Sequence, residues 1–324
     1  MAPGAFRPAR DRVTEVLAPD RQVGEVIAYL LLVHRFPDQF ERLFRAIHHP
    51  DHHYVVHVDA NAEPDIRRRI EAFLSTYPNA AMLESRPALW GGYSLVDAEL
   101  RGMAKLLEMD ANWEFFINLS GQDFPLKSQS AIRAFLSANR GKEFIRAVDQ
   151  AAVRPDTMAR LRNYVVESRH RVIRTILRRP FLRKTTPYIG NQWMIVSRRF
   201  CEFVSHNPRV ERFKRFYRHT FIADESFFQT VMMNTGDHGE VVNDDLRTID
   251  WIPDGEIKLR PRTFTAADVQ LLKPGKDLFA RKFDADVDAE ILTLLERRIA
   301  SDPVQQLAVE IYGTGATKPD LLVA

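Results

Sequence analysis

The sequence predicts an α/β fold in which a mostly parallel central sheet is flanked by helices. From residue 26 onward, segments with the pattern of buried strands alternate with segments whose apolar residues recur at helical spacing. Histidine, aspartate and other polar residues stand directly after several of those strands. The 324 residues, of which 45% are hydrophobic and 27% charged, are enough to bury one large core or two modest ones.

The first part of the chain reads as a regular series of elements. Continuous apolar runs predict strands, and apolar residues three and four positions apart predict helices. In chain order we expect a strand at 26–33, a helix at 37–47, a strand at 54–58, a helix at 63–77, a strand at 80–84, a helix at 94–109 and a strand at 113–119. This alternation is typical of a sheet covered on both faces, which binds ligands beyond the carboxyl ends of its strands.

The pattern is looser after residue 148. A basic stretch at 154–184 is followed by a predicted strand at 193–196 and by predicted helices around 198–204 and 226–233. Residues 1–25 mix Pro, Arg and Asp without periodicity, so we expect a poorly ordered lead-in there.

Composition excludes several classes of protein. Lys plus Arg exceed Asp plus Glu by three (46 − 43), an excess that suits a phosphorylated ligand better than nucleic acid. The single cysteine, Cys201, excludes an intramolecular disulfide, and the longest apolar run, at 26–33, is far shorter than the ~20 residues of a membrane span. We therefore predict a cytoplasmic protein that does not bind nucleic acid.

The polar residues after the strands predict a nucleotide-binding half. His34 follows the first strand, Asp59 the second, and the run Ser120, Gly121, Gln122 and Asp123 the fourth. No glycine-rich dinucleotide motif follows the first strand and no P-loop motif occurs in the chain, so the phosphates must be held in another way.

Five strings resemble, in the same order, those of the core-2/I-branching N-acetylglucosaminyltransferase and peptide-O-xylosyltransferase family. The most specific is NLSGQDFPLK at 118–127. The others are HVD at 57–59, WGGYS at 90–94, ADE at 223–225 with Phe228 and Gln229 behind it, and LFARKFD at 278–284. Together they span residue 27 to about residue 288, which is most of the chain.

The resemblance implies a GT-A type glycosyltransferase fold and a UDP-sugar donor. It also implies inversion at the anomeric carbon and no need for a divalent metal or other cofactor. N-acetylglucosamine or xylose would be transferred to a hydroxyl of a glycan, a lipid-linked sugar or a protein. Residues 26–148 would form the UDP-sugar half, and residues 149–324 the acceptor-binding and catalytic half of the same domain. The single cysteine and the lack of an N-terminal anchor suggest a bacterial-type member.

The resemblance also assigns donor-binding roles to residues of this chain. The nucleoside would contact Val33, His34, Asp59, Trp90 and Gly91, and the residues Ser120, Gly121, Gln122 and Asp123 would form a loop beside the donor. The diphosphate would be met by cations from Arg262, Lys282 and Arg281. Read without the resemblance, these arginines and this lysine are ordinary surface charges, Trp90 is a core residue, and Asp59 is a turn residue.

Glu225 is the predicted catalytic base, because an inverting transfer needs a carboxylate to take the proton of the attacking hydroxyl. On the acceptor side we place Trp251 and Asp224, and we also expect Asp224 to cap the helix that follows. Trp193 is expected in the core.

Two other functions remain open at this point. Metal-using relatives of the fold carry Asp-x-Asp after the fourth strand, and a metal-dependent transferase would use Asp123. A non-catalytic sugar-nucleotide or glycan-binding module is the other alternative. The histidines at 48–53 match no zinc pattern, so we expect no metal there.

The stretch 169–184 interleaves arginines with apolar residues. We expect an amphipathic helix with its arginines outside, which either packs on the domain or makes a peripheral contact with an anionic inner-membrane surface.

Overall fold

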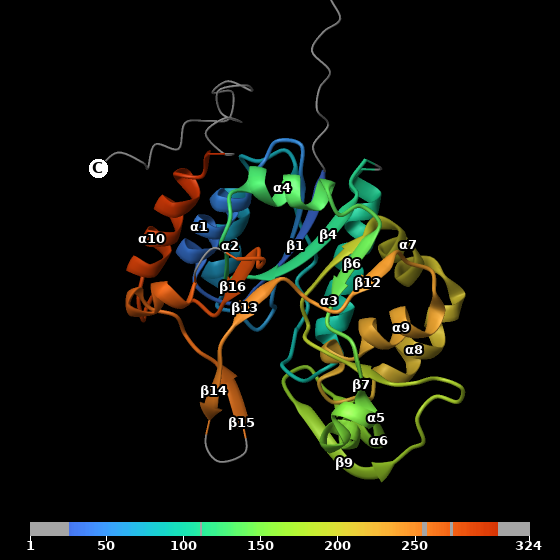
Figure 1. Ribbon diagram of the computed structural model, residues 1–324. Helices are drawn as coiled ribbons and strands as arrows, with labels where there is room; N and C mark the ends of the chain where they lie inside the picture. Colours follow the sequence, from blue (N-terminus) through green and yellow to red (C-terminus); the bar gives the residue numbers. More distant parts are fainter. Residues whose placement is uncertain (1–25, 111, 255–257, 273–274, 304–324) are drawn as a thin grey trace, which may run out of the picture.

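A seven-stranded sheet runs through the centre of the protein (Figure 1). The computed structural model describes residues 26–110, 112–254, 258–272 and 275–303. The sheet order is β12-β6-β11-β4-β1-β2-β3. Its strands are β1 (Ile27–Val33), β2 (His53–Val58), β3 (Ala80–Met82), β4 (Phe115–Ser120), β6 (Lys142–Ile145), β11 (Met194–Ser197) and β12 (Glu240–Val242). Only β11 runs antiparallel to its neighbours, which confirms the mostly parallel sheet.

Helices cover both faces of the sheet (Figure 1). One face carries α1 (Pro37–Ile47), α2 (Pro64–Leu74) and α10 (Glu290–Ala300), and the other carries α3 (Ser94–Met109), α7 (Arg198–His206), α8 (Glu211–Tyr217) and α9 (Phe227–Thr235). The connection at 126–141 between β5 and β6 contains α4 (Gln129–Ser137). Alternation along β1 sends Leu31 into the core on the α1 side and Leu30 into the core on the α3 side. The fully buried strand explains the uninterrupted apolar run.

The expected elements of the first part of the chain are present. α1 and α3 have the predicted bounds, and α1 buries Phe40, Leu43, Phe44 and Ile47, which are spaced as one helical face requires. α2 is shorter than predicted and ends at Leu74. The predicted lead-in at 1–25 lies outside the described residues.

Smaller sheets extend the central one. β13 (Arg247–Ile249), β16 (Phe279–Arg281) and β5 (Asp123–Pro125) form a three-stranded sheet whose register places Arg281 opposite Asp123. The remaining pairs are β14 (Trp251–Asp254) with β15 (Lys258–Pro261), β7 (Val148–Asp149) with β10 (Tyr188–Ile189), and β8 (Asn163–Glu167) with β9 (Val172–Arg178). Short helices are α5 (Gln150–Val153), α6 (Ala159–Arg162) and the 3₁₀ turns η1 (Pro155–Met158), η2 (Pro208–Val210), η3 (Ala223–Glu225) and η4 (Ala266–Leu271).

The helix predicted within 169–184 is wrong, because this stretch contains the strand β9, which pairs antiparallel with β8 to form a hairpin. Residues 172–176 read Val-Ile-Arg-Thr-Ile, and such β-branched side chains favour a strand over a helix. Arg179, which we expected in solvent, is only partly exposed and donates to the carbonyl oxygens of Phe216 (2.7 Å) and His219 (2.7 Å).

No helix among the described residues is long and apolar enough to cross a membrane.

Candidate active site

The polar residues that follow β1, β2 and β4 meet at one edge of the sheet. The β1–β2 pairing ends at Val33 opposite Val58, and the backbone N–H of Asp59 donates to the carbonyl of Val33 (2.9 Å), so His34 and Asp59 are neighbours. On the other side of β1, the N–H of Gly121 donates to the carbonyl of Leu32 (3.0 Å). The register of the parallel strands therefore brings together residues that are about 90 positions apart in the chain.

The predicted donor loop is a tight turn closed by Asp123. Its carboxylate is fully buried, with Oδ2 accepting from the N–H of Ser120 (2.8 Å) and Oδ1 from Nη1 of Arg281 (3.1 Å). The Ser120 hydroxyl in turn accepts from the N–H of Gln122 (3.1 Å). Both oxygens of Asp123 are thus engaged inside the protein.

β16 brings two of the predicted cations to this edge. Arg281 pairs with Asp123, and its guanidinium lies over the Trp193 ring (4.2 Å to the centroid). Lys282 is half-buried, and no carboxylate of the described residues forms an ion pair with it, since the nearby Asp284 pairs with Arg35 (3.7 Å). Burial, followed by the charges of Arg35 and Arg281, lowers the pKa of Lys282. The site therefore holds excess positive charge that an anion would neutralise.

Arg262 lies beside Lys282 through the backbone, because the N–H of Lys282 donates to its carbonyl (3.2 Å). Its guanidinium pairs with Asp250. A diphosphate would have to displace the Asp250 carboxylate before it could bind Arg262. It could bind Lys282 without displacing any carboxylate.

A buried glutamine that the sequence did not single out connects the donor loop to the lysine segment. Gln39 of α1 donates from Nε2 to the carbonyls of Gly121 (2.8 Å) and Phe283 (3.2 Å), and its Oε1 accepts from the N–H of Ala285 (2.8 Å). Gln39 therefore fixes the segment next to Lys282 against the loop after β4.

Replacing Gln39 by leucine is expected to lower the free energy of unfolding by about 1–3 kcal/mol, because buried backbone groups lose their partners. It is also expected to weaken UDP binding, since Lys282 loses its support. Gln129→Leu is the matched control: Gln129 is equally buried but bonds Tyr29 and His52, away from this edge. Thermal unfolding and calorimetric titration with UDP would measure both effects. If both variants lose the same amount of UDP affinity, Gln39 stabilises the fold in general and does not specifically support Lys282.

The predicted nucleoside contacts differ in exposure. Val33 is buried in the core, and Asp59 Oδ1 accepts from the N–H groups of Asn61 (2.8 Å) and Ala88 (3.3 Å). The pKa of His34 is lowered by desolvation and then by Arg35, which favours the neutral imidazole. Trp90 is 76% exposed and is therefore not a core residue.

Trp90 is followed by a turn at Gly91, a position where only glycine fits. Gly91 has a φ of +77°, and a Cβ there would lie 2.6 Å from the ring of Phe221. The Trp90 and Phe221 rings meet edge to face (5.7 Å), and the carbonyl of Gly91 accepts from the N–H of Ile222 (2.9 Å). The tryptophan loop is thus fastened to the segment that leads into Glu225.

Glu225 is held by an arginine that the sequence did not single out. Nη1 of Arg160 donates to Glu225 Oε2 (2.6 Å), and the N–H of Gly190 donates to the Glu225 carbonyl (2.8 Å). The Glu225 side chain is 30% exposed, so solvent or a substrate hydroxyl can reach it.

Asp224 does not cap the following helix, contrary to the prediction. It lies in η3, while α9 begins at Phe227 after Ser226 and has no side-chain cap. The Asp224 side chain is buried, and its Oδ1 has no partner in the described structure. Burial, followed by the charge of Glu225, raises the pKa of Asp224 to about 7.

A second buried carboxyl lies near Asp224. Glu99 of α3 is fully buried, and its Oε1 accepts from Asn118 (2.8 Å) and Gln192 (3.2 Å). Burial and the charge of Asp224 raise the pKa of Glu99 well above its usual value. One residue after Gln192 comes Trp193, which is buried as expected, beneath Arg281. These contacts connect the base side of the site with the cation side.

Trp251 is 44% exposed on β14, where it lies opposite Pro261, the residue before Arg262. Cys201 is buried in α7, as expected. In the described part of the chain no group of side chains could hold a metal ion, and His52 instead accepts from the N–H of Ile27 (3.2 Å).

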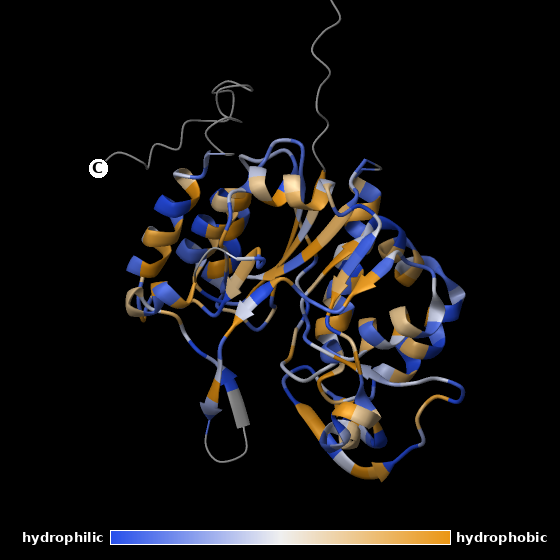
Figure 2. Ribbon diagram, in the orientation of Figure 1, coloured by the Kyte–Doolittle hydropathy of each residue, from blue (hydrophilic) through white to orange (hydrophobic). Residues whose placement is uncertain are grey.

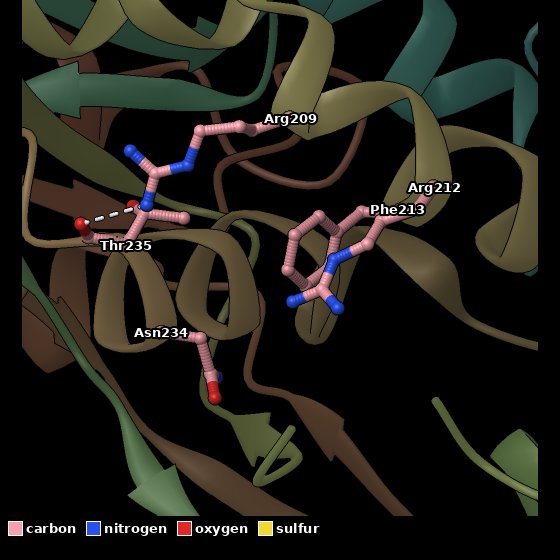
Figure 3. A pocket seen from close by; sticks show the side chains of 5 residues that line it. All are labelled: Arg209, Arg212, Phe213, Asn234 and Thr235. Atoms are coloured by element: carbon pink, nitrogen blue, oxygen red, sulfur yellow. Dashed lines mark hydrogen bonds between the residues drawn. The ribbon is translucent and has the colours of Figure 1, made fainter. Parts of the chain in front are cut away.

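The pocket in Figure 3 does not belong to this site. It has a volume of about 150 Å³ and is lined by Arg209, Arg212 and Phe213 with Asn234 and Thr235, all on or next to α8 and α9. Ligand pockets are typically about 300 Å³ or larger. Arg209 is also already paired with Asp237 (2.7 Å).

Comparison with known proteins gives consistent results. The family model described as Core-2/I-Branching enzyme matches residues 27–273. Rat xylosyltransferase 1 is 33% identical over 295 residues, which cover 83% of this chain and 35% of that protein. Mouse N-acetyllactosaminide β-1,6-N-acetylglucosaminyl-transferase is 30% identical over 312 residues, which cover 90% of this chain and 76% of that protein. The chain thus spans about a third of the length of the xylosyltransferase that it matches.

Proposed function

Because the chain belongs to the Core-2/I-branching enzyme family, which has a GT-A-like fold, we propose that it is a UDP-sugar-dependent glycosyltransferase. It transfers N-acetylglucosamine or xylose to a hydroxyl of a glycan, a lipid-linked sugar or a protein. The observation that carries the proposal is the half-buried Lys282 without an ion pair, at the sheet edge where His34 and Asp59 lie. The rat relative is named for xylose transfer and the mouse relative for N-acetylglucosamine transfer, and these names support both sugars as candidates.

The reaction is a single displacement with inversion. The acceptor hydroxyl oxygen attacks the anomeric carbon, the bond from that carbon to the UDP oxygen breaks, and its electron pair leaves with UDP. The hydroxyl proton passes to the carboxylate of Glu225, which is partly exposed and held in place by Arg160. Asp224 is buried behind it and keeps a negative potential near the base when it is ionised.

The leaving diphosphate gains negative charge as the bond breaks. Lys282 meets that charge directly, and a fixed cation in a partly desolvated place stabilises it more strongly than water does. Arg281 has a supporting role, because its guanidinium is shared with Asp123 and stacked on Trp193. Arg262 can contact the diphosphate only after its ion pair with Asp250 is broken.

The contacts of Asp123 support a mechanism without a metal ion. A divalent cation would need carboxylate oxygens beside the diphosphate, and both oxygens of Asp123 already accept hydrogen bonds from the protein. To bind a metal, Asp123 would have to release Arg281 and open the turn at Ser120.

EDTA is therefore expected to leave the rate of UDP release within about two-fold of the untreated rate, because fixed cations do the work of the ion. The measurement is UDP release with the best donor, before and after chelation and dialysis. A loss of activity that Mn²⁺ restores would favour the metal-dependent alternative with Asp123.

The proposal as a whole is tested by screening UDP release. The donors are UDP-N-acetylglucosamine, its epimer, UDP-xylose and UDP-glucuronate, each with glycan, lipid-linked and peptide acceptors. Acceptor-dependent release with one donor supports the transferase. Tight binding of a donor without turnover on any acceptor would instead favour a non-catalytic binding module.

A further inference from the structure

The β8–β9 hairpin exposes a cluster of large apolar side chains. Ile176 is 97% exposed and Leu177 is 64% exposed, and Val166 and Ile173 are exposed as well. Figure 2 shows the hydrophobic stretches on the strand β9, at the lower end of the view. We call Val166, Ile173, Ile176 and Leu177 the hairpin surface. A single exposed leucine is ordinary, but four such residues on one hairpin mark a binding surface.

The register explains why Val166 and Ile173 face outward. Val165 lies opposite Arg174, and that pair faces the protein, with Val165 buried and the Arg174 guanidinium over the Phe221 ring (5.2 Å). Val166 lies opposite Ile173 on the other face of the hairpin. Ile176 and Leu177 lie where the pairing of the two strands shifts its register, and both are exposed there.

Cations without carboxylate partners surround the hairpin surface. Residues 168–184 contain seven Lys and Arg residues and no Asp or Glu. Arg179 serves the fold and Arg174 packs on Phe221, whereas the other five are exposed: Arg169, Arg171, Arg178, Arg183 and Lys184. In the ranges that the structure describes, none of these five forms an ion pair. Elsewhere on the surface arginines pair readily, as Arg198 does with Glu202 (2.9 Å).

We propose that the hairpin surface binds an anionic phospholipid membrane. Isoleucine and leucine side chains would enter the boundary between head groups and acyl chains, while the arginines would contact lipid phosphates around them. An anionic bilayer offers both an apolar phase and a dense negative surface. A nucleic acid offers only the charge, and it would leave Ile176 and Leu177 in water.

Membrane binding of this kind would orient the candidate active site. The hairpin packs through Arg174 on Phe221, whose ring meets Trp90, and Glu167 of β8 accepts from the N–H of Ser94 (3.1 Å). Trp90 and the segment leading to Glu225 therefore lie at the base of the hairpin. Membrane binding itself does not depend on the proposed function, but a lipid-linked acceptor does.

The test is co-sedimentation of the full chain with vesicles of phosphatidylglycerol and phosphatidylcholine in equal parts, compared with pure phosphatidylcholine. Three variants are compared with the wild type. One replaces Arg169, Arg171 and Arg178 by alanine, and one carries Ile176→Ser and Leu177→Ser. The matched control replaces Arg67, Arg199 and Arg297, which are exposed on α2, α7 and α10.

We expect the wild type to bind the anionic vesicles at least ten-fold more tightly than the neutral ones at low salt. The hairpin arginine variant should bind at least ten-fold more weakly than the wild type, and the control less than two-fold more weakly. The part of wild-type binding that remains at high salt should be absent in the serine variant. Thermal unfolding checks that all variants are folded. UDP release with a soluble acceptor should stay unchanged in them, which separates a failure of this proposal from a failure of the transferase assignment.

The proposal is overturned if the wild type stays in the supernatant with anionic vesicles at low salt. It is also overturned if the control loses as much binding as the hairpin arginine variant, since the attraction would then be general. Light scattering tests the alternative that a second copy of the chain covers the hairpin surface, because it measures the oligomeric state. Concentration-dependent dimers that the serine variant abolishes, without vesicle binding by the wild type, would make the hairpin surface a contact between copies.

Discussion

Glu225→Gln is expected to lower the turnover number by about 10²–10⁴-fold, which is the usual contribution of a general base, while UDP binding stays within about two-fold of wild type. Glutamine has the shape of glutamate, and its amide oxygen still accepts from Arg160, so the geometry around the base is retained. It has no carboxylate to take the proton of the acceptor hydroxyl. Steady-state UDP release and calorimetric titration with UDP would measure the two quantities.

Glu202→Gln is the matched control for this variant. Glu202 is also paired with an arginine, Arg198, through a short contact (2.9 Å), but it lies on the outer surface of α7. It should show unchanged turnover. A turnover number of Glu225→Gln within a few-fold of wild type would remove Glu225 from the mechanism and direct attention to Asp224.

Lys282→Ala is expected to lower the turnover number by about 10²–10³-fold, as the loss of one preorganised donor typically does. UDP affinity should fall by about ten-fold or more, because the variant loses a charge-assisted contact to phosphate. The affinity for uridine, which carries no phosphate, should stay unchanged. Comparing UDP with uridine by titration therefore isolates the phosphate contact.

The control here is Lys276→Ala, because Lys276 is exposed and already paired with Asp244. Lys282→Arg should recover part of the activity, since it keeps the charge. If uridine and UDP affinities fall by the same factor in Lys282→Ala, the lysine acts on the fold of the edge and not on the diphosphate.

The order of elements could be predicted because each of them carries its own periodic signal. The buried strand β1 is apolar throughout, and the apolar positions of α1 and α3 repeat at helical spacing, so even the bounds of these helices were correct. The stretch 169–184 was mistaken for an amphipathic helix because arginines and apolar residues are interleaved there. Ile173, Ile176 and Leu177 are exposed, so their spacing carried no information about packing against the protein.

Only the site residues that lie in short sequence motifs or directly after a strand could be predicted. The sequence placed His34, Asp59 and Asp123 at one edge because parallel strands end together. It gave no sign that Gln39, Glu99, Arg160 and Arg247 would reach the same region. Arg247, for example, is buried between the rings of Trp193 and Phe279 and donates to the carbonyls of Asp245 (3.1 Å) and Asn118. Such residues are recruited by tertiary contacts over more than 60 positions, and no local pattern records those contacts.

The hydrogen bond from the Gly190 backbone to the Glu225 carbonyl limits how this chain can vary in evolution. A Cβ at position 190 would lie 1.8 Å from the carbonyl oxygen of Arg146, a distance at which the backbone must move. Any side chain there would push away the segment on which the base depends. Descendants of this sequence that keep the chemistry are therefore obliged to keep a residue that contributes no functional group to it.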